Sequence, residues 1–186
     1  MTDITEAKIL ILATNGFEQS ELQKPLKDLR ERGATVHVAT PDGNEIKGWD
    51  EDDWGDTVQA DLALSDVKVE DYHGIVLPGG QINPDILRLN DDALKLIRDF
   101  HDAGKTVAAI CHAPWLLIEA GIIKGRKATC FPSIATDLKN AGAQYEDSEV
   151  VADQGIVTSR KPDDLDAFVA KTVEEIEEGK HDRKAA

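Results

Sequence analysis

Sulfur and membrane-length apolar segments are both scarce in this chain of 186 residues. It has two cysteines, Cys111 and Cys130, which cannot form the disulfide framework of a small secreted protein. The first six residues lack the basic and apolar regions of a signal peptide. No apolar run approaches the roughly 20 residues that a membrane-spanning helix needs. We therefore expect a cytoplasmic protein with reduced cysteines and no membrane segment.

Basic residues are also in short supply, with 21 Lys and Arg against 36 Asp and Glu and a formal net charge of −15. Such a surface repels phosphate backbones and anionic lipids, so nucleic acid is not an expected partner. The hydrophobic content of 41% is enough for one compact core. We expect a single domain over residues 1–186, with a core from about 7 to 178 and a charged, frayed tail over 179–186.

Short continuous apolar runs, typical of buried strands, alternate along the chain with segments whose apolar residues recur at helical spacing. Buried strands are predicted at 8–12, 35–40, 74–78 and 106–110, and a late strand pair at 149–151 and 155–159. Helices are predicted at 18–32, on both sides of Asn90, and at 112–120, 133–141 and 162–178. This alternation predicts an α/β fold with a mostly parallel sheet covered on both faces. Ligand sites in such folds lie beyond the carboxyl ends of the strands.

Cys111 stands at one such strand end, with Ala109 two positions before it and Ala113 two positions after it. Small residues in this arrangement are typical of a nucleophile elbow, where a strand turns sharply into a helix. The nearby helix N-terminus favours a thiolate and would lower the pKa of the thiol. The alternative is that Cys111 is a small buried apolar residue at the end of a core strand.

The neighbours of Cys111 are candidates for a base and for an oxyanion site. His112 can serve as a base only if the turn is distorted, because successive residues of a regular helix do not face each other. Otherwise it makes local hydrogen bonds at a helix start. Gly79 and Gly80 follow another predicted strand and offer unobstructed N–H groups for an oxyanion, although a plain tight turn has the same sequence.

Glu18 has two interpretations. Its spacing from Asn15 matches a capping box, and the helix dipole favours a carboxylate in a first turn in any protein. Alternatively, Glu18 lies next to the Cys111 sulfur, stays protonated in a crowded site and donates a hydrogen bond to the thiolate. Sequence alone favours the first.

No cofactor or metal motif is present. Neither a dinucleotide-binding nor a phosphate-binding glycine pattern occurs, and the histidines lack metal-ligand spacing. The acidic run 50–53 resembles the start of a calcium loop, but Trp54 occupies a ligand position, so a solvated loop is expected. Trp49, Trp54 and Trp115 are expected to pack in the core, with a pocket or subunit contact as the alternative.

Several motifs together resemble the ThiJ/PfpI superfamily, in particular its branch of stress proteins called intracellular protease I. The motifs are N-G-F-E-x-x-E at 15–21, L-P-G-G at 77–80, A-I-C-H-A-P at 109–114, K-N-A-G-A at 139–143 and T-S-R-K-P-D-D-L at 158–165. The resemblance covers about residues 7–178. It implies a flavodoxin-like three-layer sandwich of the class I glutamine amidotransferase type, with Cys111 as nucleophile, Glu18 as its protonated partner, and Gly80 and His112 as backbone donors.

The resemblance also implies three alternative functions. The first is a glyoxalase III or deglycase activity on reactive carbonyls, glycated proteins or peptides. The second is an oligomeric cysteine peptidase in which His112 is oriented by an acid from a neighbouring subunit, and the matching stretch N-P-D-I-L-R offers Asp85 for that position. The third is a redox sensor or chaperone-like stress protein in which Cys111 is held as a sulfinic acid. Self-association as a dimer or higher assembly is expected.

Overall fold

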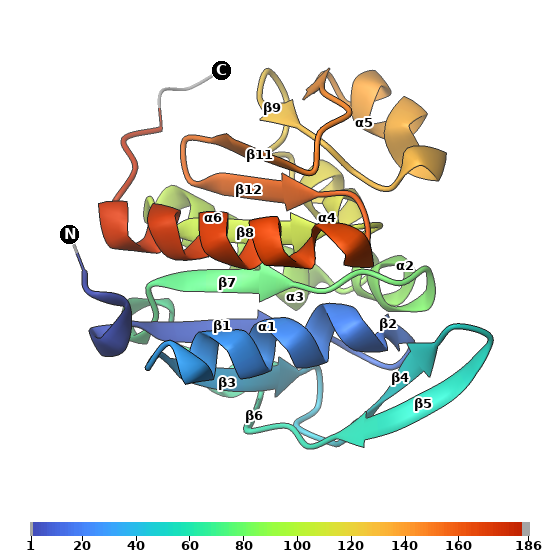
Figure 1. The fold of residues 1–186 in the computed structure, drawn as a ribbon, viewed down its shortest axis with the longest axis vertical. Helices are drawn as coiled ribbons and strands as arrows, with labels where there is room; N and C mark the ends of the chain where they lie inside the picture. Colours follow the sequence, from blue (N-terminus) through green and yellow to red (C-terminus); the bar gives the residue numbers. More distant parts are fainter. Residues whose placement is uncertain (1, 184–186) are drawn as a thin grey trace.

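A computed structural model describes residues 2–183, and its centre is a seven-stranded sheet (Figure 1). The strand order is β11-β12-β8-β7-β1-β3-β6. The strands are β1 (Lys8–Leu12), β3 (Thr35–Thr40), β6 (Leu62–Ala63), β7 (Gly74–Leu77), β8 (Thr106–Ile110), β11 (Val150–Asp153) and β12 (Ile156–Ser159). All neighbours pair in parallel except β11 and β12, which pair antiparallel. The predicted mostly parallel sheet is therefore confirmed.

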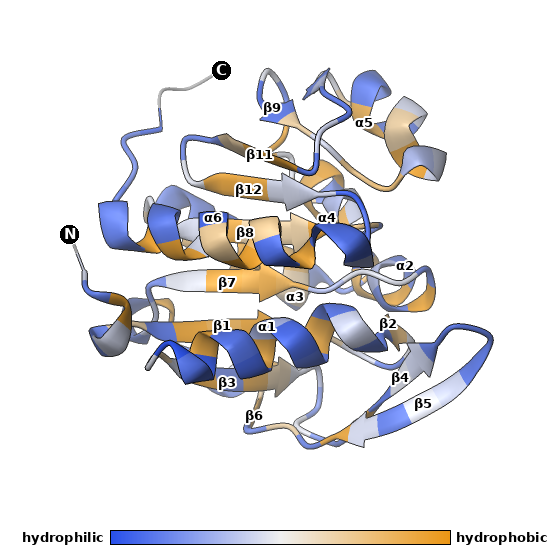
Figure 2. Cartoon of the chain, viewed as in Figure 1, coloured by the Kyte–Doolittle hydropathy of each residue, from blue (hydrophilic) through white to orange (hydrophobic). Residues whose placement is uncertain are grey.

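Helices cover both faces of this sheet. Helices α1 (Gln19–Glu31) and α6 (Leu165–Glu178) lie on one face, and α3 (Asp91–Asp102) and α4 (Pro114–Glu119) lie on the other, beside the short α2 (Ile82–Leu87) and α5 (Ala135–Asn140). Side chains of β1 alternate between the two cores: Ile9 and Ile11 join the α1/α6 side, while Leu10 and Leu12 join the α3/α4 side. In Figure 2 the central strands are mostly hydrophobic, whereas α1 and α6 carry both hydrophilic and hydrophobic residues.

Two small sheets extend beyond this core and were not predicted. One contains β2 (Phe17–Glu18), β4 (Ile46–Asp50) and β5 (Asp53–Val58), and the other pairs β9 (Lys127–Ala128) with β10 (Gln144–Tyr145). The acidic run 50–53 is solvated, as predicted, and forms the tip of the β4–β5 hairpin, where Asp50 pairs with Asp53 across a tight turn. The hairpin projects at the end of the sheet to which the strands β7 and β8 point (Figure 1).

The segment after α6 is held against the body of the protein, so the predicted fraying does not extend through residue 183. The His181 N–H donates to the Gly104 carbonyl at 2.9 Å, and Arg183 donates to the Gln154 and Lys105 carbonyls at 2.8 and 2.6 Å. Residues 184–186 of the predicted tail lie outside the described residues. Across residues 2–183, no helix has the length and apolarity needed to cross a membrane.

Candidate active site

Cys111 occupies a strained turn directly after β8. Its φ is 65°, a left-handed conformation that a residue with a side chain adopts at an energetic cost. The backbone is fixed there from two sides, because the Cys111 N–H donates to the Ser159 carbonyl at 3.0 Å and its carbonyl accepts the Phe131 N–H at 2.8 Å. Ala113 is fully buried against the core. This geometry is that of a nucleophile elbow, as the small flanking residues predict.

The distorted turn brings the side chains of Cys111 and His112 together. His112 Nδ1 lies 3.1 Å from the Cys111 sulfur, and Nε2 on the other side of the ring lies 3.2 Å from the Ser133 hydroxyl oxygen. The ring also stacks on Phe131, with centroids 4.7 Å apart. Burial lowers the pKa of His112, which keeps the ring neutral at pH 7. A neutral ring that donates Nε2–H to Ser133 leaves Nδ1 free to accept the thiol proton.

Replacement of Ser133 by alanine is expected to slow alkylation of Cys111 by iodoacetamide about fivefold at pH 7. Loss of one hydrogen bond of roughly 1 kcal/mol frees the His112 ring to adopt the other tautomer, which cannot take the thiol proton. Ser133→Thr keeps the hydroxyl and should restore the rate. An alanine variant with the wild-type rate and pH profile would contradict a positioning role for Ser133.

The acid next to the sulfur is Glu21, and not Glu18 as the family resemblance implied. Glu21 is fully buried in the first turn of α1, is hydrogen-bonded with the Cys111 thiol, and accepts the Gly79 N–H through Oε2 at 2.8 Å. Burial raises the pKa of Glu21 to about 8, so its carboxyl is protonated at pH 7. Its other oxygen, Oε1, makes no hydrogen bond within residues 2–183. It is therefore the oxygen from which the acid proton can be donated.

Glu18 has a different environment. It is the residue directly before α1, its side chain does not cap the helix, and its Oε1 accepts the Ser20 hydroxyl at 3.2 Å. The capping box expected between Asn15 and Glu18 is therefore not formed. The side chain is half-buried in the wall of the cavity in front of the sulfur. Burial raises the pKa of Glu18, and the carboxylates of Asp50 and Glu51 act in the same direction.

The two glycines after β7 are required by close packing around the sulfur. A Cβ atom on Gly79 would lie 2.6 Å from both Cys111 Cβ and Glu21 Oε2, and one on Gly80 would lie 2.6 Å from the Glu18 nitrogen. Gly80 also has a φ of 80°. The N–H groups of Gly80 and His112 are hydrogen-bonded to the Cys111 sulfur, whereas the N–H of Gly79 is used by Glu21. The backbone donors expected at Gly80 and His112 therefore face the sulfur.

Buried Asn83, which was not predicted as a site residue, holds the loops of the site together. Its Oδ1 accepts the Thr14 N–H and its Nδ2 donates to the Pro78 carbonyl, both at 2.8 Å. These bonds join the loop after β1 to the loop after β7, and both loops carry site residues. An amide side chain can do this because it offers a donor and an acceptor at once.

The resting sulfur is a thiol whose pKa is raised, which corrects the lowered value expected from a helix N-terminus. Burial is the largest cause, and a negative charge on Glu21 would add to it, while the Gly80 and His112 N–H groups oppose it. Helix α4 begins only at Pro114 and has six residues, so its dipole is small. Proton transfer to His112 when the substrate arrives can therefore form the thiolate that reacts.

A cavity of about 420 Å³ gives access to the sulfur. It is lined by Gly16, Glu18, Glu21, Trp49, Glu51, Gly80, Gln81, Ile82, Cys111, His112, Phe131 and Pro162. Two tryptophans depart from the core packing expected for them: Trp49 lines the cavity and Trp54 is 44% exposed. The volume suits a small molecule or a single side chain.

Asp85 does not reach this cavity within its own chain. It is exposed on α2 and is absent from the lining residues. Ser133, and not an acid of the same chain, contacts the far side of the His112 ring. Completion of a triad by Asp85 of a neighbouring subunit stays a prediction.

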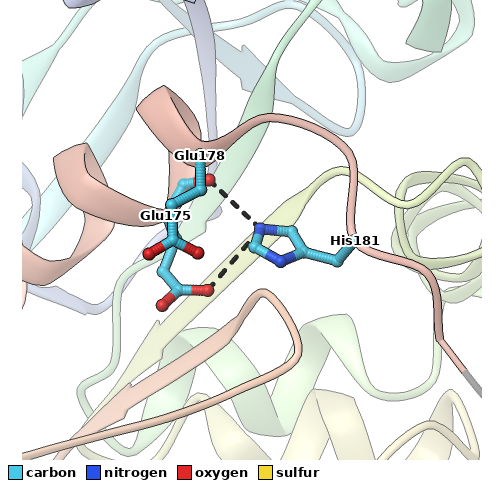
Figure 3. A group of neighbouring side chains, drawn as sticks. All are labelled: Glu175, Glu178 and His181. Atoms are coloured by element: carbon cyan, nitrogen blue, oxygen red, sulfur yellow. Dashed lines mark hydrogen bonds and ion pairs between the residues drawn. The ribbon is translucent and has the colours of Figure 1, made fainter. Parts of the chain in front are cut away.

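One group of potential metal ligands lies at the end of α6, far from the sulfur along the chain. Single ligand atoms of Glu175, Glu178 and His181 lie within 4.8 Å of one another (Figure 3). The ring already has partners, since His181 Nε2 lies 3.1 Å from the Glu175 carbonyl and 3.5 Å from its carboxylate. These contacts explain the cluster as an anchor for the segment after α6.

Comparison with known proteins shows the family of the chain. Residues 7–175 match the model of the DJ-1/PfpI family. The chain belongs to the DJ-1/PfpI family. Its relatives include Deglycase TK1284 of Thermococcus kodakarensis, 44% identical over 89% of this chain and 97% of that protein, and the putative cysteine protease YraA of Bacillus subtilis, 42% identical over 87% and 93%.

A solved structure confirms the three-layer, flavodoxin-like fold expected for a DJ-1/PfpI protein. A two-domain protein from Anabaena variabilis with DJ-1/ThiJ/PfpI-like and ferritin-like domains superimposes with a TM-score of 0.86 at 32% identity. The match covers 92% of this chain and 48% of that protein, so this chain spans about half the length of that two-domain protein.

Proposed function

We propose that this DJ-1/PfpI protein is a cysteine-dependent enzyme of the glyoxalase or deglycase type that acts on reactive carbonyls and their adducts. The observation that carries the proposal is the 3.1 Å contact between the Cys111 sulfur and a neutral His112, inside a cavity that fits a small substrate. The deglycase name of a relative 44% identical to this chain supports the same class of substrate.

The reaction follows from the positions of these groups. The sulfur adds to an aldehyde carbon of a dicarbonyl, and its proton passes to His112 Nδ1. The carbonyl oxygen takes a proton from Glu21 and becomes the hydroxyl of a hemithioacetal. The hydrogen on that carbon then moves to the adjacent carbonyl carbon, and the hydroxyl proton moves to the oxygen of that carbonyl, through an enediol, which gives a thioester of a hydroxy acid. The proton that His112 took balances the one that Glu21 gave. Water cleaves the thioester, so methylglyoxal and water give lactate without an external oxidant or reductant.

The test is lactate formation from methylglyoxal by the purified protein, with the buffer reaction subtracted. Turnover that saturates with substrate is the expected result. Cys130→Ala is a matched control, because Cys130 is buried outside the cavity and burial raises the pKa of its thiol to about 12. Lactate formation no faster than in buffer would overturn the proposal.

A cysteine peptidase is the second candidate, favoured by the same Cys111–His112 contact and by the name of the relative YraA. It would use Asp85 of a neighbouring subunit to orient His112 in the assembled protein. Two assays on one preparation distinguish these functions. Peptide release from casein without lactate formation supports the peptidase, and lactate formation without peptide release supports the carbonyl enzyme.

We further propose that the protein self-associates in the cytoplasm. The support for an assembly is a group of exposed apolar side chains on and after α2, where Ile82, Ile86 and Leu89 are 37%, 48% and 85% exposed. Burial of such neighbouring side chains is favourable. Sedimentation velocity that finds only monomers at micromolar concentration would contradict the assembly.

A further inference from the structure

A second cavity, of about 640 Å³, lies at the opposite end of the central sheet from Cys111. Two of its lining residues, His73 and Lys105, directly precede β7 and β8, whereas Cys111 directly follows β8. Its other walls come from the segment before β7 and from the ends of α3 and α6. Figure 1 shows the end of α6 beside the N-terminal region, where β7 begins. The reaction proposed at Cys111 does not use this cavity.

Two lysines line this cavity without a carboxylate partner. Lys105 is half-buried and donates to the Val69 and Tyr72 carbonyls. Neither Lys105 nor Lys180 belongs to the ion pairs that lysines form within residues 2–183. Burial lowers the pKa of Lys105, and the positive charge of Lys180 acts in the same direction. An anion between the two ammonium groups would offset this repulsion.

His73 adds a third donor to the cavity. Its Nδ1 accepts the Lys8 N–H at 3.0 Å, so Nδ1 carries no proton and the proton of the neutral ring is on Nε2. This Nε2–H has no acceptor in the part of the chain that the structure describes. The cavity therefore offers one imidazole N–H and two ammonium groups to the oxygen atoms of a ligand.

An unpartnered hydroxyl is buried next to the cavity wall. Thr106, which follows Lys105, is 1% exposed, and its Oγ1 makes no hydrogen bond within residues 2–183. A Cβ atom on Gly74 would lie 3.2 Å from Thr106 Cβ and 3.3 Å from Cδ1 of Ile176, a residue of the wall. Buried hydroxyls ordinarily have a partner, and an oxygen atom that enters from the cavity can supply one.

The charges and the apolar part of the lining fit a singly charged organic anion. Glu70 is the one acidic residue among the described residues that line the cavity, so two lysines and one glutamate leave a single positive charge. This local excess stands out in a chain whose net charge is −15. Val69, Ala103 and Ile176 form an aliphatic wall that inorganic phosphate would leave uncovered. The volume suits a small organic molecule.

We infer that this cavity binds a small organic carboxylate with an apolar body. The carboxylate group lies between Lys105 and Lys180, within reach of the His73 N–H, and the apolar body packs against the aliphatic wall. Charge-assisted hydrogen bonds and burial of apolar surface both favour this placement. The site is separate from Cys111, so it does not depend on the proposed function.

The test is isothermal titration calorimetry with three probes: sodium hexanoate, hexanamide, which has nearly the same shape without the charge, and inorganic phosphate. Hexanoate is expected to saturate one site per chain below about 20 mM and to bind about fivefold more tightly than either other probe. Its affinity should fall as salt is increased from about 20 to 500 mM, since Lys180 is exposed.

Substitutions of the two lysines assign the binding to this cavity. Lys180→Gln and Lys105→Gln are each expected to weaken hexanoate binding about fivefold and to leave hexanamide binding unchanged. Glutamine at 105 keeps N–H groups for the two carbonyls, and if this variant fails to fold, Lys180→Gln at its exposed position still decides. Lys95→Gln is the matched control, because it removes an exposed lysine that pairs with Asp99 outside the cavity.

Cys111→Ser should bind hexanoate as the wild type does, which places the ligand away from the sulfur. Four results would each overturn the site: no saturable binding of hexanoate, equal affinity for hexanamide, tighter binding of phosphate, or an affinity that Lys180→Gln does not change. Lys180→Gln should form lactate from methylglyoxal at the wild-type rate. A wild-type protein that binds hexanoate as described but forms no lactate would overturn the proposed function and leave this site intact.

Discussion

Replacement of Cys111 by serine is expected to reduce kcat/KM for carbonyl turnover by at least about a thousandfold. A hydroxyl at this position is a much weaker nucleophile than sulfur, and a neutral His112 cannot remove its proton as readily. The substitution is nearly isosteric, so the melting temperature should change little. Lactate formation from methylglyoxal and thermal unfolding of the same preparation measure the two quantities.

Two controls separate the loss of chemistry from the loss of structure. Cys130→Ala should retain activity and should still incorporate one iodoacetamide label, at Cys111. Cys111→Ser should incorporate none at neutral pH, because the Cys130 thiol is fully buried and lies outside the cavity, so the reagent does not reach it. A Cys111→Ser protein that keeps a tenth or more of the wild-type rate would show that this sulfur is not the nucleophile.

The position of this sulfur could be predicted because the signal is local. An apolar run ending in Ala109-Ile110-Cys111-His112-Ala113 defines both the strand and the tight turn, and small flanking residues are needed wherever that turn occurs. The contact between Cys111 and His112 was conditional on a distorted backbone, and the φ of 65° provides the distortion. The main-chain geometry of five residues was therefore sufficient to predict the position of the sulfur and its contact with His112.

The acid could not be assigned in the same way, because two glutamates lie one helical turn apart. Which of Glu18 and Glu21 faces the sulfur depends on how α1 lies on the sheet. One signal was available: Glu21, Pro25 and Leu29 recur every four residues and are all buried, so a carboxyl lies on the apolar side of α1. A charged residue in that stripe is rare unless it has a function.

Other features depend on tertiary packing alone. The raised pKa of the Cys111 thiol follows from burial, which the helix-dipole argument did not include. Ser133 lies 21 residues from His112 along the chain, in the 3-10 helix Pro132–Ile134, and no short pattern specifies that their side chains meet. The β4–β5 hairpin was not predicted, because its acidic turn resembles a solvated loop and its strand β4 is completed by pairing with β2.

The wild-type protein is expected to become less stable as the pH rises, because Glu21 ionises in a buried site. Substitution of Glu21 by glutamine should abolish this part of the pH dependence. The pKa of Glu21 is about 8 in the folded protein and near 4.5 when the chain is unfolded. The folded state therefore holds the proton more tightly than the unfolded state. The stabilisation from this proton is fully present below pH 4.5 and is lost as the pH rises through about 8. From this single group, the free energy of unfolding should fall by about 4 kcal/mol between pH 5 and 9.

Glutamine is the informative replacement, because it stays neutral and still accepts the Gly79 N–H, whereas alanine would leave that buried donor unpaired. Urea unfolding of both proteins at pH 5, 7 and 9 measures the effect as a difference, in which the titrating groups that do not interact with Glu21 cancel. The variant should also retain Cys111 alkylation above pH 8, where a charged Glu21 opposes the thiolate in the wild type. Parallel stability curves for the two proteins would show that Glu21 is ionised throughout, and the sulfur would then lack its acid partner.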